Sequence, residues 1–208
     1  MGLSGRVFRA TAVAFCFSAV SYGTIIFDSG VIALSAGSPT QLGRISRDGI
    51  ISDWSSPKVF PGTINPATSY HYENYLVPIQ YFPFIQISFD DVSGQANTFA
   101  SAYLNSYNPA NKALNYLGDA GSSGNFFGVD PIAFQVLVDT GNTLVVVVND
   151  ANAAGAGVGQ PYRIIVEGFS DTNFNEATPE PATMLLSGGG LGVALLLFRR
   201  SRKTNRTN

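Results

Sequence analysis

Residues 132–148 read IAFQVLVDTGNTLVVVV and carry the clearest strand pattern of the chain. Every second residue from Ile132 to Val138 is large and apolar, which is typical of a strand with one buried face. Residues 144–148 are continuously apolar and rich in valine, which predicts a central strand covered on both faces. Asp-Thr-Gly-Asn at 139–142 separates the two runs, so we predict a β-hairpin here.

Similar strand signals recur between residues 24 and 169, with almost no helical periodicity. Apolar residues alternate through 85–89 and 162–166, an aromatic-rich run at 70–77 stops at Pro78, and residues 99–104 are a shorter candidate. Turns rich in Gly, Asn, Asp and Pro separate these runs. We therefore predict an all-β fold, an antiparallel β-sandwich with a jelly-roll-like strand order, to which residues 24–69 add edge strands.

The N-terminal residues 1–23 have the features of a secretory signal peptide. Arg6 and Arg9 precede an 11-residue apolar segment, and small residues allow cleavage after Ser21 or Gly23. An uncleaved membrane anchor is the main alternative. A lipoprotein signal at Cys16 is disfavoured, because a large phenylalanine precedes that cysteine where a small residue is expected.

The C-terminal residues 179–208 contain three parts in a fixed order. Pro179, Glu180 and Pro181 come first, and residues 182–198 then form an apolar run of 17 residues without a charge. A helix of this length spans about 25 Å, enough for a thin bilayer core. A basic tail follows, which would stay on the cytoplasmic side and comprises Arg199, Arg200, Arg202 and Lys203. Everything before Pro179 is then presented outside the membrane.

This order of motif, helix and basic tail resembles the PEP-CTERM sorting signal. The resemblance implies that a membrane protease, exosortase, recognises and removes the tail after export through the Sec translocon. It further implies a Gram-negative host, transient anchoring in the inner membrane, and release to the cell surface or an extracellular biofilm matrix containing exopolysaccharide. The alternative is an ordinary C-terminal anchor that follows a proline-rich linker.

The middle of the chain resembles the prepeptidase C-terminal (PPC-like) β-sandwiches of secreted bacterial proteins. The segments that carry this resemblance are FIQISF at 84–89, SAYL at 101–104, NYLGDAG at 115–121, GNTLVVVV at 141–148 and YRIIVEG at 162–168. The resemblance implies a non-catalytic module. The predicted organisation is thus a signal peptide at 1–23, a sandwich domain at 24–171, a linker at 172–178 and the sorting signal at 179–208.

Charge and cysteine content exclude several classes of function. Between Asp28 and Glu176 the chain has 13 acidic and five basic residues, a net charge of −8. An acidic domain with scattered cations has no electrostatic footprint for nucleic acid. The single cysteine, Cys16, lies in the predicted signal peptide, so neither a disulfide framework nor a zinc cluster is expected in the domain.

Candidate catalytic chemistry is sparse, and we predict that the protein is not an enzyme. His71 is the only histidine and lies in a strand-like aromatic run, and no Gly-x-Ser-x-Gly motif is present. A calcium site is the one metal hypothesis, because oxygen ligands bind calcium outside cells. Its candidate ligands are Asp90, Asp91, Asp119 and Asp150, although Asp also favours turns without any metal. No other cofactor is expected.

Carbohydrate binding is a further hypothesis for an exported domain. A sugar-binding face would use an aromatic platform, for which the candidates are Trp54, Tyr70, Tyr72, Tyr75, Tyr81 and Phe82. Aromatic residues in strands more often belong to the core. The sequence therefore predicts an exported non-enzymatic protein sorted to the surface or matrix, with a carbohydrate-binding or peptidase-associated accessory module, stabilised by calcium, as the alternative.

Overall fold

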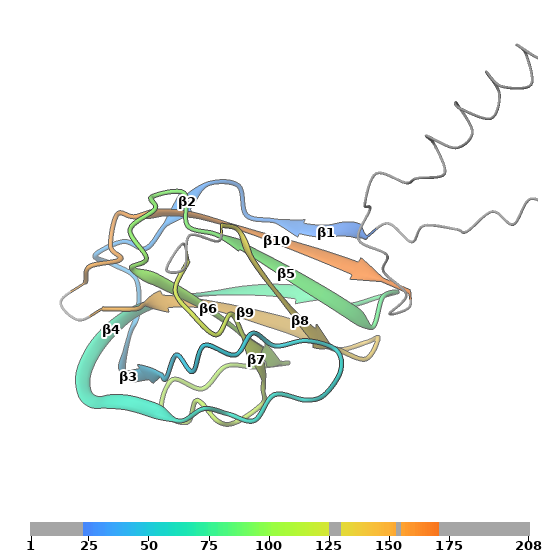
Figure 1. Ribbon diagram of the computed structural model, residues 1–208, viewed down its shortest axis with the longest axis horizontal. Coiled ribbons are helices and arrows are strands. Elements are labelled where there is room, and N and C mark those ends of the chain that lie inside the picture. The colour runs from blue at the N-terminus through green and yellow to red at the C-terminus, as the bar shows by residue number, and fades with distance from the viewer. Residues whose placement is uncertain (1–22, 125–129, 153–154, 171–208) are drawn as a thin grey trace, which may run out of the picture. The chain divides into compact units, whose positions relative to one another are not determined.

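The computed structural model describes residues 23–124, 130–152 and 155–170, and these residues are all-β (Figure 1). The strands are β1 (Thr24–Asp28), β2 (Ile32–Ala33), β3 (Thr40–Ile45), β4 (Thr63–Pro78), β5 (Phe84–Asp90), β6 (Thr98–Leu104), β7 (Tyr116–Asp119), β8 (Ile132–Leu137), β9 (Thr143–Asp150) and β10 (Pro161–Phe169). Every pairing between these strands is antiparallel, as the sequence predicts.

The strands form two five-stranded sheets. The first sheet has the order β1-β10-β5-β8, with β2 also pairing with β10, and the second has the order β3-β4-β9-β6-β7. From β3 onward every connection crosses between the sheets, except those from β3 to β4 and from β6 to β7. This alternation fits the predicted antiparallel β-sandwich, and the jelly-roll-like order stays a prediction.

The inward faces of the two sheets share one hydrophobic cluster. In β5 the side chains of Ile85, Ile87 and Phe89 are completely buried, and the residues between them are partly exposed. β8 and β10 alternate in the same way, which confirms the predicted strands with one buried face. Tyr75 of the second sheet and Tyr162 of the first meet across the core, with their hydroxyl oxygens 2.7 Å apart.

The predicted hairpin around residues 139–142 is wrong in its pairing, although the turn is present. Asn142 N donates to Asp139 O at 3.2 Å. The strands on either side, however, belong to different sheets: β8 pairs with β5, whereas β9 pairs with β4 and β6. A turn sequence specifies that the chain reverses, but it does not specify whether the chain returns within a sheet or into the opposite layer. The apolar strand β9 lies inside the second sheet, where it pairs with β4 along one edge and with β6 along the other.

β9 is buried on both faces, as predicted, because a loop covers the outer side of the second sheet. Residues 105–115 join β6 to β7, and the ring of Tyr107 packs against the rings of Tyr72 and Tyr103 at centroid distances of 5.4 and 4.6 Å. Tyr72 lies three positions before the inward-facing Tyr75 and so lies on the opposite face of β4. The 105–115 loop is therefore a third layer over part of this sheet.

The remaining predictions concern the borders of the domain. The aromatic run at 70–77 is the second half of β4, which ends at Pro78 as expected but begins at Thr63. β1 and β3 are edge strands from the region 24–69, as predicted. Across the described residues no helix is long and apolar enough to span a membrane. The predicted signal peptide, linker, transmembrane run and basic tail lie outside the described residues.

Candidate functional site

The loop formed by residues 46–62, which joins β3 to β4, bridges the two sheets at the edge where β7 and β8 lie. Ser52 N donates to Asp119 O on β7 at 3.1 Å, and Gln135 N on β8 donates to Ser52 O at 2.8 Å. Trp54 Nε1 also donates to a β8 carbonyl, that of Val136, at 3.1 Å. The 46–62 loop thus hydrogen-bonds to an edge strand of each sheet.

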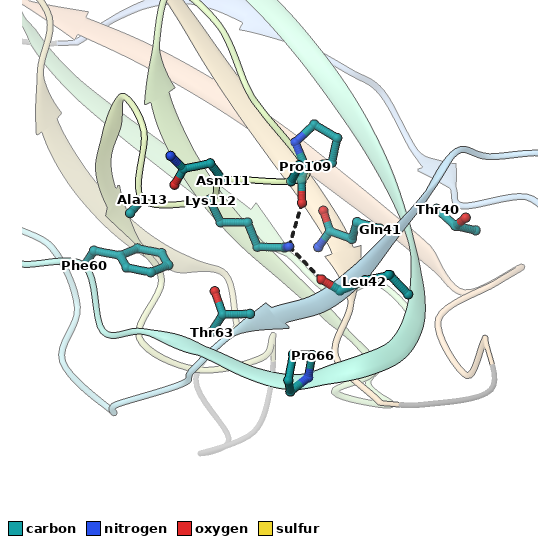
Figure 2. A pocket seen from close by; sticks show the side chains of 11 residues that line it. Thr40, Gln41, Leu42, Phe60, Thr63, Pro66, Pro109, Asn111, Lys112 and Ala113 are labelled. Carbon is teal, nitrogen blue, oxygen red and sulfur yellow. Dashed lines mark hydrogen bonds between the residues drawn. The ribbon is translucent and has the colours of Figure 1, made fainter.

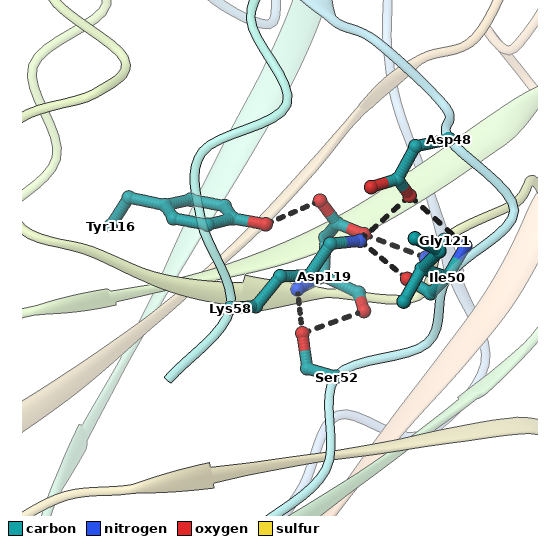
Figure 3. A network of polar contacts seen from close by, with 7 residues as sticks. All are labelled: Asp48, Ile50, Ser52, Lys58, Tyr116, Asp119 and Gly121. Atoms are coloured by element: carbon teal, nitrogen blue, oxygen red, sulfur yellow. Dashed lines mark hydrogen bonds and ion pairs between the residues drawn. The ribbon is translucent and has the colours of Figure 1, made fainter. Parts of the chain in front are cut away.

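A buried lysine anchors this loop (Figure 3). The ammonium of Lys58, whose side chain is 6% exposed, donates to Asp119 Oδ1 at 2.6 Å and to Asp48 Oδ1 at 2.8 Å. Its third acceptor is the carbonyl oxygen of Ile50. An ammonium group has three donors, so the hydrogen-bonding capacity of Lys58 is fully used by the loop and β7.

The carboxylate of Asp119 is completely buried at the centre of this network. Its Oδ2 accepts from the Tyr116 hydroxyl at 2.5 Å, and its Oδ1 accepts from Gly121 N at 2.7 Å as well as from Lys58. Burial raises the pKa of Asp119, although these hydrogen bonds favour the ionised form and oppose the rise. Burial acts in the same direction on Asp48, but its hydrogen bonds from Lys58 and Ile50 prevail and lower the pKa of Asp48. The network holds one ammonium between two carboxylates and ties the 46–62 loop to β7.

A second buried carboxylate, Asp150 at the end of β9, fastens the connection to β10. Its Oδ2 accepts from His71 N at 3.1 Å and lies 3.2 Å from His71 Nδ1, and its Oδ1 accepts from Gly157 N at 2.7 Å. His71 lies within β4, which confirms the expected strand position. An Asp–His pair is two thirds of a hydrolase triad, but among the described residues no hydroxyl or thiol side chain is bonded to His71.

Asp90 and Asp91 lie at the end of β5, where Asp91 organises the turn that follows. Asp91 Oδ1 accepts from Ser93 Oγ at 2.5 Å, Asp91 Oδ2 accepts from Ala96 N at 2.7 Å, and Asp91 N donates to Asp130 Oδ1 at 3.0 Å. Burial raises the pKa of Asp130, and the negative charges of Asp90 and Asp91 add to this effect. Asp91 therefore stabilises a turn, which is the role that was expected for these Asp residues if they do not bind calcium.

The structure does not bring the four calcium candidates together. Asp119 belongs to the Lys58 network, Asp150 to the His71 contact, and Asp90 and Asp91 to the turn after β5. Within the described ranges no three Asp, Glu, His or Cys side chains are grouped so that they could hold a metal ion. Calcium binding stays a prediction, and its proposed ligands have other partners.

The expected aromatic platform is mostly part of the interior. Tyr70 and Tyr72 are buried, and Tyr75, Phe82 and Trp54 are half-buried. Tyr81 is the exposed member of the set, at 77%. Trp54 packs edge-on against Phe84 and Phe169, with ring centroids 5.8 and 5.7 Å apart, so it holds the 46–62 loop on the sandwich.

A pocket of about 590 Å³ lies between β3, the beginning of β4 and the 109–113 segment (Figure 2). Lys112, which is 4% exposed, extends along it and donates from Nζ to Leu42 O and Pro109 O, each at 2.8 Å. Burial lowers the pKa of Lys112. Neither Lys58 nor Lys112 is predicted as a site residue from the sequence. The only available signal was their rarity, as two of five cations in an acidic region.

The predicted sorting residues Pro179, Glu180 and Pro181 and the basic tail lie outside the described residues, and their individual roles stay predictions. Residues 177–203 match the PEP-CTERM protein-sorting motif. This motif implies an exported protein that exosortase sorts, with transient membrane anchoring before display at the cell surface. The predicted resemblance to the PEP-CTERM signal is therefore confirmed for the C-terminal segment.

No curated protein and no solved structure matches the chain. The resemblance of the middle region to PPC-like domains therefore stays a prediction. The fold of that region is established from its own strand order and core.

Proposed function

We propose that this chain is a non-enzymatic exported protein that exosortase releases to the cell surface or to an extracellular biofilm matrix. The observation that carries the proposal is the PEP-CTERM motif at residues 177–203, placed after an all-β domain. In this proposal the chain crosses the inner membrane of a Gram-negative bacterium through the Sec translocon. Exopolysaccharide of the matrix is the proposed partner of the sorted domain.

The roles of the polar side chains support a structural rather than a catalytic domain. Lys58, Asp119 and Asp48 fasten the 46–62 loop, and His71 and Asp150 fasten the connection between β9 and β10. Groups that could act as acid, base or nucleophile are thus engaged in holding loops to the sandwich. A surface protein without disulfides benefits from such anchors, because loops are the first segments to open.

The proposal is tested by the mass and location of the protein in cells with and without exosortase. We expect the normal cells to contain a surface or released form that has lost the residues after the Pro179-Glu180-Pro181 motif. Cells without exosortase should retain a longer form in the membrane. A Glu180→Gln variant should behave in normal cells like wild type without exosortase, whereas Glu176→Gln, the matched change outside the motif and just before the matched segment, should be processed normally.

A full-length tail in the membrane of normal cells would overturn the sorting proposal and leave a single-pass anchored protein. Equal processing with and without exosortase would overturn it as well. The calcium binding predicted from the sequence is tested separately, by thermal unfolding with calcium and with a chelator. An unchanged melting temperature would contradict that prediction without affecting sorting.

A further inference from the structure

The pocket beside Lys112 lies next to an interruption in the pairing of β3 with β4. Leu42 pairs with Ser69 and Arg44 with Ile64, so Gly43 alone lies opposite residues 65–68. Gly43 has a φ of +70°, and a Cβ atom there would lie 2.8 Å from Thr63 Cγ2 and 3.0 Å from Ile64 O. Bulges of this kind redirect side chains and occur often beside functional sites. Here Pro66 of the bulge forms one wall of the pocket.

The two buried lysines of the domain differ in how many of their ammonium donors form hydrogen bonds within the protein. Lys58 Nζ donates to three protein oxygens, two of which belong to carboxylates. Lys112 Nζ donates to two backbone carbonyls, and within the described part of the chain no carboxylate is paired with it. A buried ammonium without a counter-charge is costly. One donor and the charge of Lys112 are therefore available to a ligand in the pocket that it lines.

The rest of the lining combines apolar surface with amide and hydroxyl groups (Figure 2). Phe60, Leu42 and Pro66 provide apolar surface, while Gln41 and Thr63 bring an amide and a hydroxyl. The Oε1 of Gln41 accepts from the Tyr107 hydroxyl, which leaves the amide nitrogen of Gln41 as the donor on the pocket side. A volume of about 590 Å³ falls within the range of small-molecule sites and exceeds what a simple carboxylate such as acetate would fill.

We infer that this pocket binds an acidic sugar of the uronate class, whose carboxylate accepts a hydrogen bond from Lys112 Nζ. In this inference the ring hydroxyls would bond to the Gln41 amide and the Thr63 hydroxyl, and the apolar side of the ring would pack against Phe60 or Pro66, which all line the pocket. A uronate has a negative charge, hydroxyl groups and an apolar ring face, which complement the ammonium, polar and apolar groups of the lining. Neutral sugars lack the charge, and small carboxylates lack the ring.

This inference deepens the proposed function, because it names the chemical class of matrix polysaccharide that the sorted domain would contact. The two can nevertheless fail separately. Sorting depends on residues 177–203 and is measured in cells, whereas the pocket lies between β3, β4 and the 109–113 segment and is measured on purified protein.

The experiment is isothermal titration of the full chain, purified in mild detergent, with sodium glucuronate, glucose and sodium acetate at constant ionic strength. We expect saturable binding of glucuronate and at least about tenfold weaker binding of glucose and acetate. Lys112→Met should weaken glucuronate binding on the order of tenfold or more, because it removes the charged donor. Arg163→Met is the matched control: it removes a cation of the other sheet that does not line the pocket, and it should bind glucuronate like the wild type.

Ala113→Trp provides a second test that leaves Lys112 in place. Ala113 is an exposed residue of the pocket lining, so the larger side chain can occupy the pocket without disturbing the core. It should abolish glucuronate binding while the circular dichroism spectrum stays unchanged. The inference is overturned by any of three results: no saturable glucuronate binding up to about 10 mM, equal binding of acetate or glucose, or unchanged affinity in folded Lys112→Met and Ala113→Trp proteins.

Discussion

Lys58 lies 61 residues before Asp119 in the chain, yet its ammonium donates to Asp119 Oδ1 at 2.6 Å in the interior. The contact joins a loop without regular structure to the edge strand β7. Removing one member of a buried pair leaves the other charged and unpaired, which is more costly than the pair itself. The stability of the 46–62 loop therefore depends on both residues being present.

The first prediction concerns this pair. Lys58→Met should lower the free energy of unfolding by about 3 kcal/mol, since the Asp119 carboxylate stays buried without its cation. The double variant Lys58→Met/Asp119→Leu should lose less than the sum of the single variants. Urea unfolding of all four proteins measures the coupling between the residues. Additive losses would show that the two side chains do not stabilise the loop together.

The second prediction concerns Gly118, which lies directly beneath the 46–62 loop. A Cβ atom at this position would lie 2.3 Å from Ser52 Oγ and 3.0 Å from Val136 Cγ1. Gly118→Ala should therefore displace Ser52 and lower the free energy of unfolding by about 2 kcal/mol. Amide exchange of Gln135, whose N–H donates to Ser52 O, should accelerate. Gly37→Ala is the control, because its Cβ would meet only Ser35 Oγ at 3.7 Å.

The third prediction compares two leucines on either side of the 139–142 turn. Leu144 in β9 is completely buried, whereas Leu137 in β8 is 47% exposed. Leu144→Ala should cost about 3 kcal/mol of unfolding free energy, because it leaves a cavity in the core. Leu137→Ala should cost about 0.5 kcal/mol. Similar losses at both positions in denaturant unfolding would contradict the assignment of β9 to the centre of the second sheet.

The fourth prediction concerns the pH dependence of the β1–β10 contact. Arg163 Nε donates to Asp28 Oδ1 at 2.9 Å and its second nitrogen donates to Oδ2 at 2.5 Å. These hydrogen bonds, together with one from Gly30 N, lower the pKa of Asp28 from 3.8 to about 2. A depressed carboxyl pKa stabilises the folded state above the unfolded value, so this contribution is complete above pH 3.8 and is lost as the pH falls toward 2.

Carboxyl-detected NMR titration measures the Asp28 midpoint directly. In the unchanged protein the midpoint should lie near 2, and in Arg163→Gln it should return toward 3.8. Hydrogen bonds from Ser55 lower the pKa of Asp53, which takes no part in the Arg163 contact, so the Asp53 midpoint should be the same in both proteins and serves as the internal control. A midpoint near 3.8 in the unchanged protein would contradict the contact.

The sequence predicted the strands whose residues alternate between core and surface, because that pattern depends on local periodicity. Ile85, Ile87 and Phe89 face the core as expected, and the continuous apolar run at 144–148 is central. Local periodicity does not, however, indicate which strands pair with one another. The turn at 139–142 reverses the chain as predicted, but the choice between sheets depends on pairing with residues 65 (Pro78 with Thr143) to 77 (Tyr72 with Asn149) positions away in the chain.

The candidate site was less predictable for the same reason. Asp119 was singled out as an oxygen ligand, and its true partner, Lys58, lies in a loop with no local pattern that links the two. The aromatic candidates were correctly weighed against the core, where Tyr70 and Tyr72 are buried. The sorting motif was predictable because its three parts follow one another in the chain and need no fold to be recognised.

The pairing of β1 with β10 has a consequence for the order of events during export. Thr24 lies opposite Gly168, so the earliest strand of the domain is completed only by its latest strand. A chain that emerges from a translocon N-terminus first can form neither the β1–β10 pair nor the full first sheet until residue 168 has passed. Long-range pairings of this kind close slowly. Closure of the domain and arrival of the sorting motif at residues 177–203 are therefore consecutive events in translocation.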